Sequence, residues 1–186
     1  MKRAIVVGAS YGGMEAIRNL LSGFPAGFDL PVIVVLHIGS NNIDAYIARL
    51  NEKTGFLVKE ADEKEMIMPG TAYFAPPNYH LQIENDFSFS LSTDKKVNFS
   101  RPSIDVLFET AAWVFKEGLI GILLTGANND GAQGLISVKK YDGTTIVENP
   151  ETAVAPAMPR AATELFKPDY VLNLECITNK VIELCR

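Results

Sequence analysis

Short runs of consecutive apolar residues alternate along the chain with stretches in which apolar residues recur every three or four positions. Residues 3–8 and 31–37 are apolar at nearly every position, which predicts buried strands, whereas residues 14–22 and 42–53 have helical spacing. Strands that are apolar on both faces are typical of parallel sheets with helices on each side. The pattern therefore predicts a doubly wound α/β fold.

The middle of the chain interrupts this alternation. Between residues 57 and 100, turn-forming pairs such as Pro69-Gly70, Pro76-Pro77 and Asn85-Asp86 separate short runs with strand character. We interpret this segment as a β-rich insertion that contains a hairpin. Its strand-like runs are residues 71–75, 80–84 and 87–91.

The alternation resumes near residue 103 and continues to the C-terminus. Ser103 is the predicted N-cap of the next helix, with Asp105 in its first turn, where the helix dipole favours a carboxylate. At ~150 residues per domain, the 186 residues predict one domain, 1–186, with a mostly parallel sheet, helices on both faces and a small β-hairpin insertion. The expected elements are a helix at 103–116, a strand at 119–125, a helix at 131–141, a strand at 144–148, a short helix after Pro159, a strand at 170–172 and a final helix.

Charge and composition narrow the class of protein. Lys and Arg total 17 against 22 Asp and Glu, so the net charge of −5 argues against a nucleic-acid partner held through its phosphates. The apolar runs are too short for a signal peptide or for a membrane span of ~20 residues, so we expect neither secretion nor membrane insertion. Cys176 and Cys185 lie nine positions apart on opposite faces of the predicted last helix and cannot pair there, which favours a reducing cytoplasm.

Polar residues stand at the carboxyl ends of three predicted strands, the edge at which open parallel sheets bind their ligands. Ser10 follows the first strand, His37 ends the second, and Asp130 follows the strand after the insertion. A serine nucleophile needs a base to take its proton, and the base needs an acceptor that fixes its tautomer. The three residues are therefore candidates for a hydrolase triad.

The loop around Ser10 fits two motifs. Residues 8–12 match G-x-S-x-G, a strand-to-helix turn that exposes a serine oxygen, and residues 8–13 match a dinucleotide-phosphate loop with serine for its middle glycine. A nicotinamide-nucleotide site would want an acidic residue where this sequence has His37. A plain glycine-rich turn, a structural His37 and a turn-forming Asp130 are the simpler alternatives.

The second histidine, His80, follows the Pro76-Pro77 turn inside the predicted insertion. We expect it to be a surface or packing residue, although it could border the site. Two histidines and no cysteine cluster at ligand spacing give no convincing metal site, and we expect no cofactor.

Five blocks of the sequence, in order and over nearly the whole chain, resemble the CheB-type chemotaxis protein-glutamate methylesterase catalytic domain. The blocks are Gly8-Ala9-Ser10-x-Gly12-Gly13, the strand-end His37, residues 101–108 (RPSIDVLF), Thr125-Gly126-x-x-x-Asp130-Gly131-Ala132-x-Gly134 and Met158-Pro159-Arg160-Ala161-Ala162. Residues 75–81 (APPNYHL) also resemble the family's Ala-Pro-Gly-x-x-His-Leu block, with Pro77 in place of glycine.

The resemblance implies hydrolysis of glutamate methyl esters on the cytoplasmic helices of methyl-accepting chemoreceptors, with glutamine deamidation as a further activity of some members. Ser10 would be the nucleophile, His37 the general base and acid, and Asp130 the orienting carboxylate. Backbone N–H groups near Tyr11 and Ala127 would hold the oxyanion.

Three further residues in the shared blocks are candidates for substrate binding. Arg101 and Arg160 would form a local basic rim for acidic receptor helices, unless each is only a solvated or helix-start charge. Met158 belongs to the same block as Arg160. Tyr11 stands where a small residue is usual, so its bulk could narrow access to the site. Ala127-Asn128 and Ala157 replace the usual Met-Gly and glycine.

Family members usually carry an N-terminal phosphoacceptor receiver domain, for which this chain leaves no room. We therefore expect regulation by a separate phosphorylated receiver protein, or constitutive activity. The alternative to an enzyme is a catalytically silent module of the same fold. Such a module would dock on receptor helices or hold an anion at residues 8–13.

Overall fold

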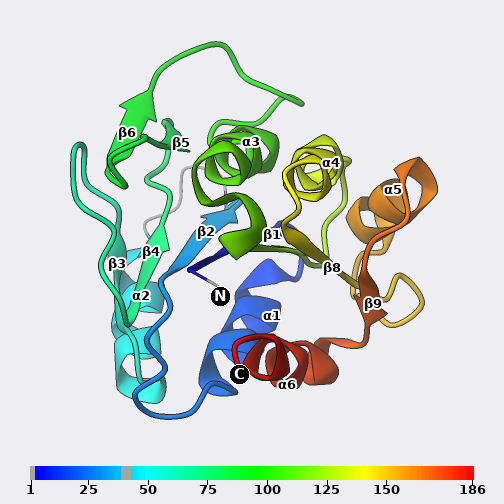
Figure 1. Cartoon of the computed structure of the whole chain (residues 1–186), viewed down its shortest axis with the longest axis horizontal. Helices are drawn as coiled ribbons and strands as arrows, with labels where there is room; N and C mark the ends of the chain where they lie inside the picture. The colour runs from blue at the N-terminus through cyan, green and yellow to red at the C-terminus, as the bar shows by residue number, and fades with distance from the viewer. Residues whose placement is uncertain (1–2, 39–42) are drawn as a thin grey trace.

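The computed structural model describes residues 3–38 and 43–186, which form one large sheet, a separate strand pair and helices (Figure 1). Seven parallel strands make the sheet, in the order β3-β4-β2-β1-β7-β8-β9, and β5 and β6 form the antiparallel pair. The strands are β1 (Ala4–Ala9), β2 (Val32–Leu36), β3 (Leu57–Glu60), β4 (Thr71–Phe74), β5 (His80–Ile83), β6 (Phe89–Ser92), β7 (Leu119–Leu123), β8 (Thr144–Glu148) and β9 (Tyr170–Leu172).

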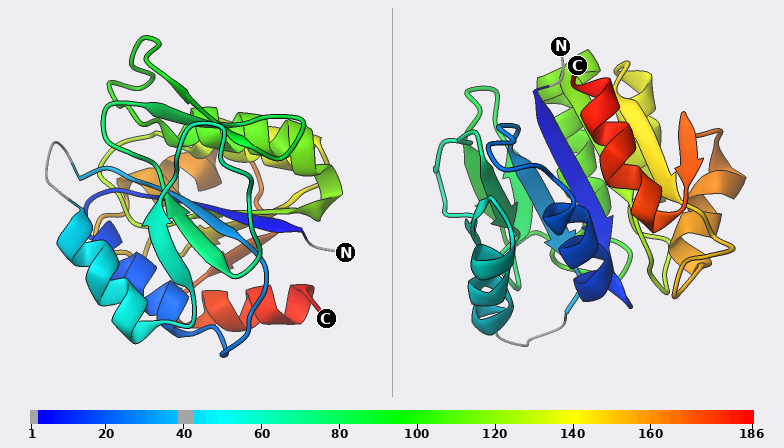
Figure 2. Two further views of the ribbon diagram at one scale, coloured as in Figure 1. Left: turned by 90° about the vertical axis from the view of Figure 1, so that its left-hand side faces the viewer. Right: turned by 90° about the horizontal axis from the view of Figure 1, so that it is seen from below.

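Helices cover both faces of the sheet, which confirms the predicted doubly wound class (Figure 2). One face carries α1 (Gly13–Ser22), α2 (Asp44–Lys53) and α6 (Leu174–Leu184). The other face carries α3 (Ile104–Phe115), α4 (Ala132–Lys140) and α5 (Ala157–Leu165), and a short 3₁₀ turn, η1 (Lys116–Gly118), follows α3.

The central strands are apolar throughout because their two faces supply two separate cores. Every residue of β1 and β2 is buried. Val6 and Ile33 belong to the core beneath α3 and α4, whereas Ile5 and Val7 belong to the core beneath α1 and α6. Since side chains alternate between the faces of a strand, only a continuous apolar run fills both cores.

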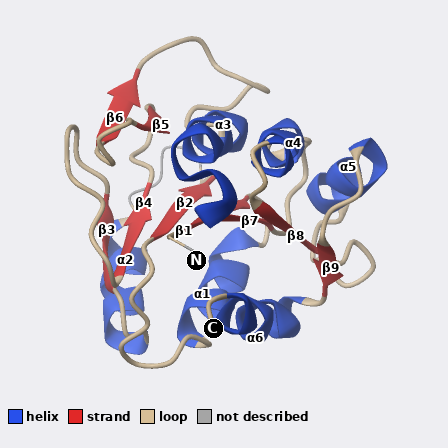
Figure 3. Cartoon of the chain, in the orientation of Figure 1, coloured by secondary structure: helices blue, strands red, loops and turns tan. Residues whose placement is uncertain are grey.

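The prediction that residues 71–75 belong to a β-rich insertion is wrong. β4 lies inside the main sheet, parallel to β2 on one side and to β3 on the other. No helix joins β3 to β4, so the βαβ alternation that identifies a parallel strand is absent there. The predicted hairpin is confined to β5 and β6, which pack beside α3 (Figure 3).

Several predicted boundaries shift by a few residues. α5 begins at Ala157 and includes Pro159, because proline is tolerated in the first turn of a helix, where backbone N–H groups have no intrahelical partner. The predicted helix at 42–53 is α2, and residue 42 lies outside the described residues.

Two findings bear on the expected environment of the chain. Within residues 3–38 and 43–186, Cys176 is exposed, Cys185 is partly buried, and no disulfide joins them. In the same part of the chain, none of the helices combines the length and the apolar content that crossing a bilayer requires.

Gly8 gives a test of how closely α3 packs on the sheet. A Cβ added at Gly8 would overlap the Cγ2 methyl of Ile104 and lie 3.0 Å from its Cδ1. Since Ile104 is fully buried, Gly8→Ala is expected to lower the free energy of unfolding by about 1–3 kcal/mol in urea denaturation. Gly55→Ala is the control, because its nearest neighbour would be 3.5 Å away. Equal stability of the two variants would contradict tight packing at Gly8.

Candidate active site

Ser10 and His37 lie at the carboxyl ends of neighbouring strands. The last aligned pair of β1 and β2 is Ala9 and Leu36, and the His37 N–H donates a hydrogen bond of 3.1 Å to the Ala9 carbonyl. The Ser10 N–H donates across to the Thr125 carbonyl, which follows β7, at 2.9 Å. Because β1 lies between β2 and β7, Ser10 sits between the loop with His37 and the loop with Asp130.

A tight turn leads from Ser10 directly into α1. The Gly13 N–H donates to the Ser10 carbonyl at 2.8 Å, and Gly12 has a φ of 80°, in the left-handed region that favours glycine. A Cβ on Gly12 would also meet the Val154 side chain at 3.0 Å. The predicted G-x-S-x-G turn is therefore present, with a partly exposed serine at its centre.

The loop after β7 is held by two side chains to which the sequence analysis assigned no role. Glu148, buried at the end of β8, accepts the Thr125 N–H at 2.7 Å. The Thr125 hydroxyl donates to the Tyr11 carbonyl at 2.9 Å and accepts the Ala155 N–H at 2.8 Å. Three loops around Ser10 are thereby tied together.

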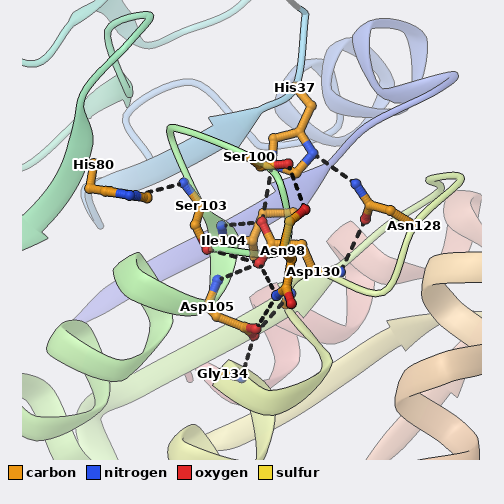
Figure 4. Close-up of polar contacts among 11 residues, drawn as sticks. His37, His80, Asn98, Ser100, Ser103, Ile104, Asp105, Asn128, Asp130 and Gly134 are labelled. Carbon is orange, nitrogen blue, oxygen red and sulfur yellow. Dashed lines mark hydrogen bonds and ion pairs between the residues drawn. The ribbon is translucent and has the colours of Figure 1, made fainter. Parts of the chain in front are cut away.

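Asp130 is a fully buried carboxylate at the N-terminus of α3 (Figure 4). Its Oδ2 accepts the Ile104 N–H at 2.7 Å, and its Oδ1 accepts the Asp105 N–H at 3.2 Å. Its Oδ1 also accepts the Ser103 hydroxyl at 2.9 Å and the Asn98 amide at 3.1 Å. The carboxylate thus satisfies N–H groups that have no partner within the helix.

The surroundings of Asp130 keep it ionised. Burial acts to raise the pKa of this carboxyl. The contact with His37 and the hydrogen bonds from Ile104, Asn98 and Ser103 act in the opposite direction and hold the pKa below its usual value. A negative charge is therefore available beside His37 at neutral pH.

Asp130 and Asn128 contact opposite nitrogens of the His37 ring (Figure 4). His37 Nε2 lies 3.1 Å from Asp130 Oδ2, and His37 Nδ1 lies 3.2 Å from Asn128 Nδ2. The first contact is at ion-pair distance, although Nε2 is not aligned well enough for a hydrogen bond. An ionised carboxylate repels a lone pair, so the neutral ring carries its proton on Nε2 and its lone pair on Nδ1.

The structure brings the three predicted catalytic residues to one edge of the sheet, but joins only two of them. His37 contacts Asp130, whereas the Ser10 hydroxyl makes no hydrogen bond within residues 3–38 and 43–186. Catalytic hydrogen bonds are often loose before substrate binds, so this arrangement leaves the predicted role of Ser10 open to test.

Two backbone N–H groups lie near Ser10 without an acceptor among the described residues. They belong to Tyr11, which follows Ser10, and to Ala127, in the loop after β7. The two loops meet at Gly126 of the loop after β7, where an added Cβ would lie 3.0 Å from the Ser10 Cβ. The Tyr11 side chain is 68% exposed, so its bulk projects toward solvent.

The remaining predicted site residues have different surroundings. Met158 is fully buried, and its sulfur would lie 2.7 Å from a Cβ on Gly126, so it supports the loop from beneath. Arg101 lines a cavity of about 360 Å³ beside His37, and its Nη1 donates to the carbonyls of residues 93 and 94. Arg160 is exposed and pairs with Glu151 at 3.3 Å.

His80 is a packing residue at the border of the site, since its partner Ser103 donates its hydroxyl to Asp130. It is buried, its Nδ1 accepts the Ser103 N–H at 3.1 Å, and its Nε2 lies 3.1 Å from the Lys95 carbonyl. The ring therefore links β5 to the start of α3. The expectation of a surface position is wrong, whereas packing is confirmed, and the contact through Ser103 places His80 next to Asp130.

Ser103 and Asp105 have roles that their helical positions did not predict. Ser103 occupies the N-cap position of α3, but its hydroxyl donates to Asp130 and does not cap its own helix. Asp105 Oδ1 accepts the N–H groups of Gly131 and Gly134 at 2.9 and 2.6 Å, which joins α3 to α4. Both contacts connect segments about 26 residues apart, which no local pattern reveals.

Asn98 also escaped the sequence analysis. Its amide donates to Asp105 at 2.7 Å and to Asp130 at 3.1 Å. Asn98 and Phe99 both have positive φ and lie between Val97 and Ser100, which pair as an isolated bridge. Asparagine tolerates this conformation and is typical of such turns, but phenylalanine is not, so the turn had no recognisable signal.

Burial raises the pKa of Asp105 from 3.8 to about 6, and the charge of Asp130 adds to the effect. The folded protein therefore holds a proton that the unfolded chain releases, and the stability that Asp105 contributes is lost as pH rises through about 6. Relative to wild type, Asp105→Asn is expected to gain up to about 1.4 kcal/mol per pH unit between pH 4 and 6. Urea denaturation across this range measures the difference, and parallel stability curves would contradict it.

Residues 3–38 and 43–186 contain no group of three or more His, Cys, Asp or Glu side chains arranged to hold a metal ion. The fold and the site define an α/β domain that presents a serine loop and a histidine–carboxylate pair at the carboxyl edge of a parallel sheet.

Comparison with known proteins identifies the family within this class. The family model of the CheB methylesterase matches residues 5–181. The crystal structure of the Thermotoga maritima CheB methylesterase catalytic domain superimposes with a TM-score of 0.94, at 34% sequence identity, over 99% of each chain. This chain belongs to the CheB methylesterase family.

Two relatives differ in the share of their own length that this chain covers. The protein-glutamate methylesterase/protein-glutamine glutaminase of Clostridium acetobutylicum is 34% identical over 98% of this chain, which spans 53% of that enzyme. A Leptospira interrogans protein, whose name assigns it the same two activities provisionally, is 49% identical over 97% of this chain and 94% of its own length.

Proposed function

We propose that this chain hydrolyses glutamate methyl esters on methyl-accepting chemoreceptors, through Ser10, His37 and Asp130. The observation that carries the proposal is the contact of His37 with an ionised, fully buried Asp130, next to the exposed turn of Ser10. Proteins that bear the names of this family act on glutamate esters and glutamine amides, and the chain shares their fold over its whole described length.

The first half-reaction forms an ester between the substrate glutamyl group and Ser10. His37 Nδ1 takes the hydroxyl proton as the serine oxygen attacks the ester carbonyl, and Asp130 stabilises the imidazolium that forms. The C–O bond to the methoxy group then breaks, and His37 returns the proton to the leaving oxygen. Methanol departs and the acyl group remains on Ser10.

The second half-reaction restores the enzyme. His37 takes a proton from water, the resulting hydroxide attacks the acyl carbonyl, and Ser10 leaves with the proton held by His37. The glutamic acid side chain that forms loses its proton to solvent and is released as the carboxylate. Replacing methanol by ammonia gives glutamine deamidation by the same steps, which we propose as a second activity.

The negative oxygen of each tetrahedral intermediate needs donors that are already in place. The N–H groups of Tyr11 and Ala127 have no acceptor among the described residues and lie on the two loops that meet at Gly126. We therefore assign the oxyanion hole to them, where one donor is typically worth ~10²–10³ in rate. Met158 supports this hole through its packing on Gly126.

The test of the proposed function is release of methanol from methylated receptor fragments. We expect release by the purified chain and formation of one carboxylate per methanol. Binding of the receptor without any methanol would favour the silent docking module instead. Addition of a phosphorylated receiver protein tests the further proposal that a separate polypeptide raises the rate.

Arg101 and Arg160 are proposed to attract acidic receptor helices, although the chain as a whole is negatively charged. Screening shortens to ~10 Å at 0.1 M salt, so the KM for methylated receptor is expected to rise with salt. Arg160→Gln is expected to raise KM about 2- to 5-fold at low salt, since an exposed charge pair is worth up to about 1 kcal/mol. Lys167→Gln, at another exposed position, is the control. A KM that neither salt nor the arginine variants change would contradict the proposal.

A further inference from the structure

The Asn128 side chain contacts the nitrogen of His37 that accepts the Ser10 proton in the proposed mechanism. Its side-chain Nδ2 lies 3.2 Å from His37 Nδ1, on the side of the ring away from Asp130 (Figure 4). Because the neutral ring carries its proton on Nε2, Nδ1 has the lone pair and the amide N–H donates to it. This lone pair is the one that must accept the serine proton.

The orientation of the Asn128 amide follows from its second contact. Its Oδ1 accepts the Asp130 N–H at 3.1 Å, so the amide nitrogen must face His37. The reversed amide would place an N–H against the Asp130 N–H and an oxygen against the lone pair of His37, losing both bonds. Asn128 is therefore a donor to His37 in this arrangement.

Two other features of the site fit this contact. The Ser10 hydroxyl makes no hydrogen bond among the described residues, although its loop adjoins His37. His37 Nε2 is at ion-pair distance from Asp130 but is poorly aligned with it. A His37 ring oriented toward Asn128 explains both observations. Its Nδ1 lone pair accepts the Asn128 amide and is not available to Ser10, and its Nε2–H points away from the Asp130 carboxylate.

We propose that Asn128 is a positioning residue that caps the base nitrogen of His37 in the resting enzyme and competes with Ser10 for it. The proposal rests on the proposed function of Ser10 and His37. Asn128 lies in the loop between β7 and α4 and is only partly buried, so its side chain has space to turn away. When it does, the lone pair becomes available to the serine hydroxyl and the ring N–H can align with Asp130.

The chain offers matched variants for the test. Asn128→Ala removes both contacts of the side chain. Asn128→Ser keeps an acceptor for the Asp130 N–H, since serine forms the same kind of turn, but is too short to reach His37. Asn129→Ala is the control, because Asn129 is exposed and its side chain makes no hydrogen bond among the described residues.

The first measurement is the rate at which a small fluorophosphonate phosphonylates Ser10. This probe reports on activation of the serine without any receptor contact. Releasing the lone pair from one hydrogen bond is expected to raise the rate about 2- to 10-fold in Asn128→Ala and Asn128→Ser, and to leave Asn129→Ala unchanged. An unchanged or lower rate in both folded Asn128 variants would overturn the proposal.

The second measurement is a two-bond ¹H–¹⁵N spectrum of the imidazoles, which identifies the protonated nitrogen of His37 without any need for activity. We expect the proton on Nε2 in wild type and a change in the Nδ1 shift in the Asn128 variants, with no change in Asn129→Ala. A proton on Nδ1 in wild type would overturn the proposal. Labelling of Ser10 in no variant would remove the proposed function, and the competition with it, while the spectrum still decides whether Asn128 binds Nδ1.

Discussion

Replacing Ser10 with alanine is expected to lower methanol release by ~10⁴–10⁶-fold while the protein stays folded. The loss of rate follows because no other group supplies the attacking oxygen. Stability should be nearly unchanged, since the hydroxyl makes no hydrogen bond among the described residues and the turn is held by the backbone of Ser10. Methanol release from methylated receptor and urea denaturation measure the two effects.

Ser22→Ala is the control for this variant, because Ser22 is an exposed serine at the far end of α1. It should keep both activity and stability. Undiminished methanol release by Ser10→Ala would show that Ser10 is not the nucleophile. A Ser10→Ala protein that has lost its fold as well as its activity would point to the glycine-rich turn as a purely structural feature.

His37→Gln is expected to lower turnover by ~10³-fold or more. Glutamine can fill the space and donate to Asp130, but it cannot take the serine proton and return it to the leaving group. Single-turnover methanol release by wild type and by the variant measures the loss.

His80→Gln is the matched control, since the chain has two histidines. His80 is buried and accepts the Ser103 N–H. We therefore expect His80→Gln to be less stable than wild type but to keep its turnover at temperatures below its melting temperature. If His80→Gln abolished turnover while His37→Gln retained it, the assignment of the base would be reversed.

The sequence predicts the centre of the sheet better than its edge. β1 and β2 fill two cores at once, so their composition alone indicates buried parallel strands. β3 and β4 are four residues long each and follow one another without a helix, so the same kind of pairing leaves no periodic signal there. β4 joins the sheet by pairing with β2, which lies far away in sequence, and β3 joins it by pairing with β4.

The candidate site likewise contains residues that the sequence predicts and residues that it does not. Ser10, His37 and Asp130 follow strands that neighbour one another in the sheet, so strand order alone predicts that they lie at the same edge of it. Asn98 and Asn128 could not be found this way, because asparagine in a turn is ordinary and its partner is set by tertiary packing. The sequence predicts which residues gather at this edge of the sheet, and tertiary packing sets which nitrogen of His37 faces Asn128.

The N-terminus of α3 is capped by a residue from a distant segment. Asp130 accepts the first N–H groups of the helix, a role that the side chain of Ser103 at the N-cap position would ordinarily have. The Asp130 carboxylate therefore both caps α3 and contacts His37. The amide proton of Ile104 consequently reports on the site, because it can exchange with solvent only when its hydrogen bond to Asp130 breaks. Its exchange rate, followed during heating or on binding of receptor, would time the disassembly of the histidine–carboxylate pair without a substrate present.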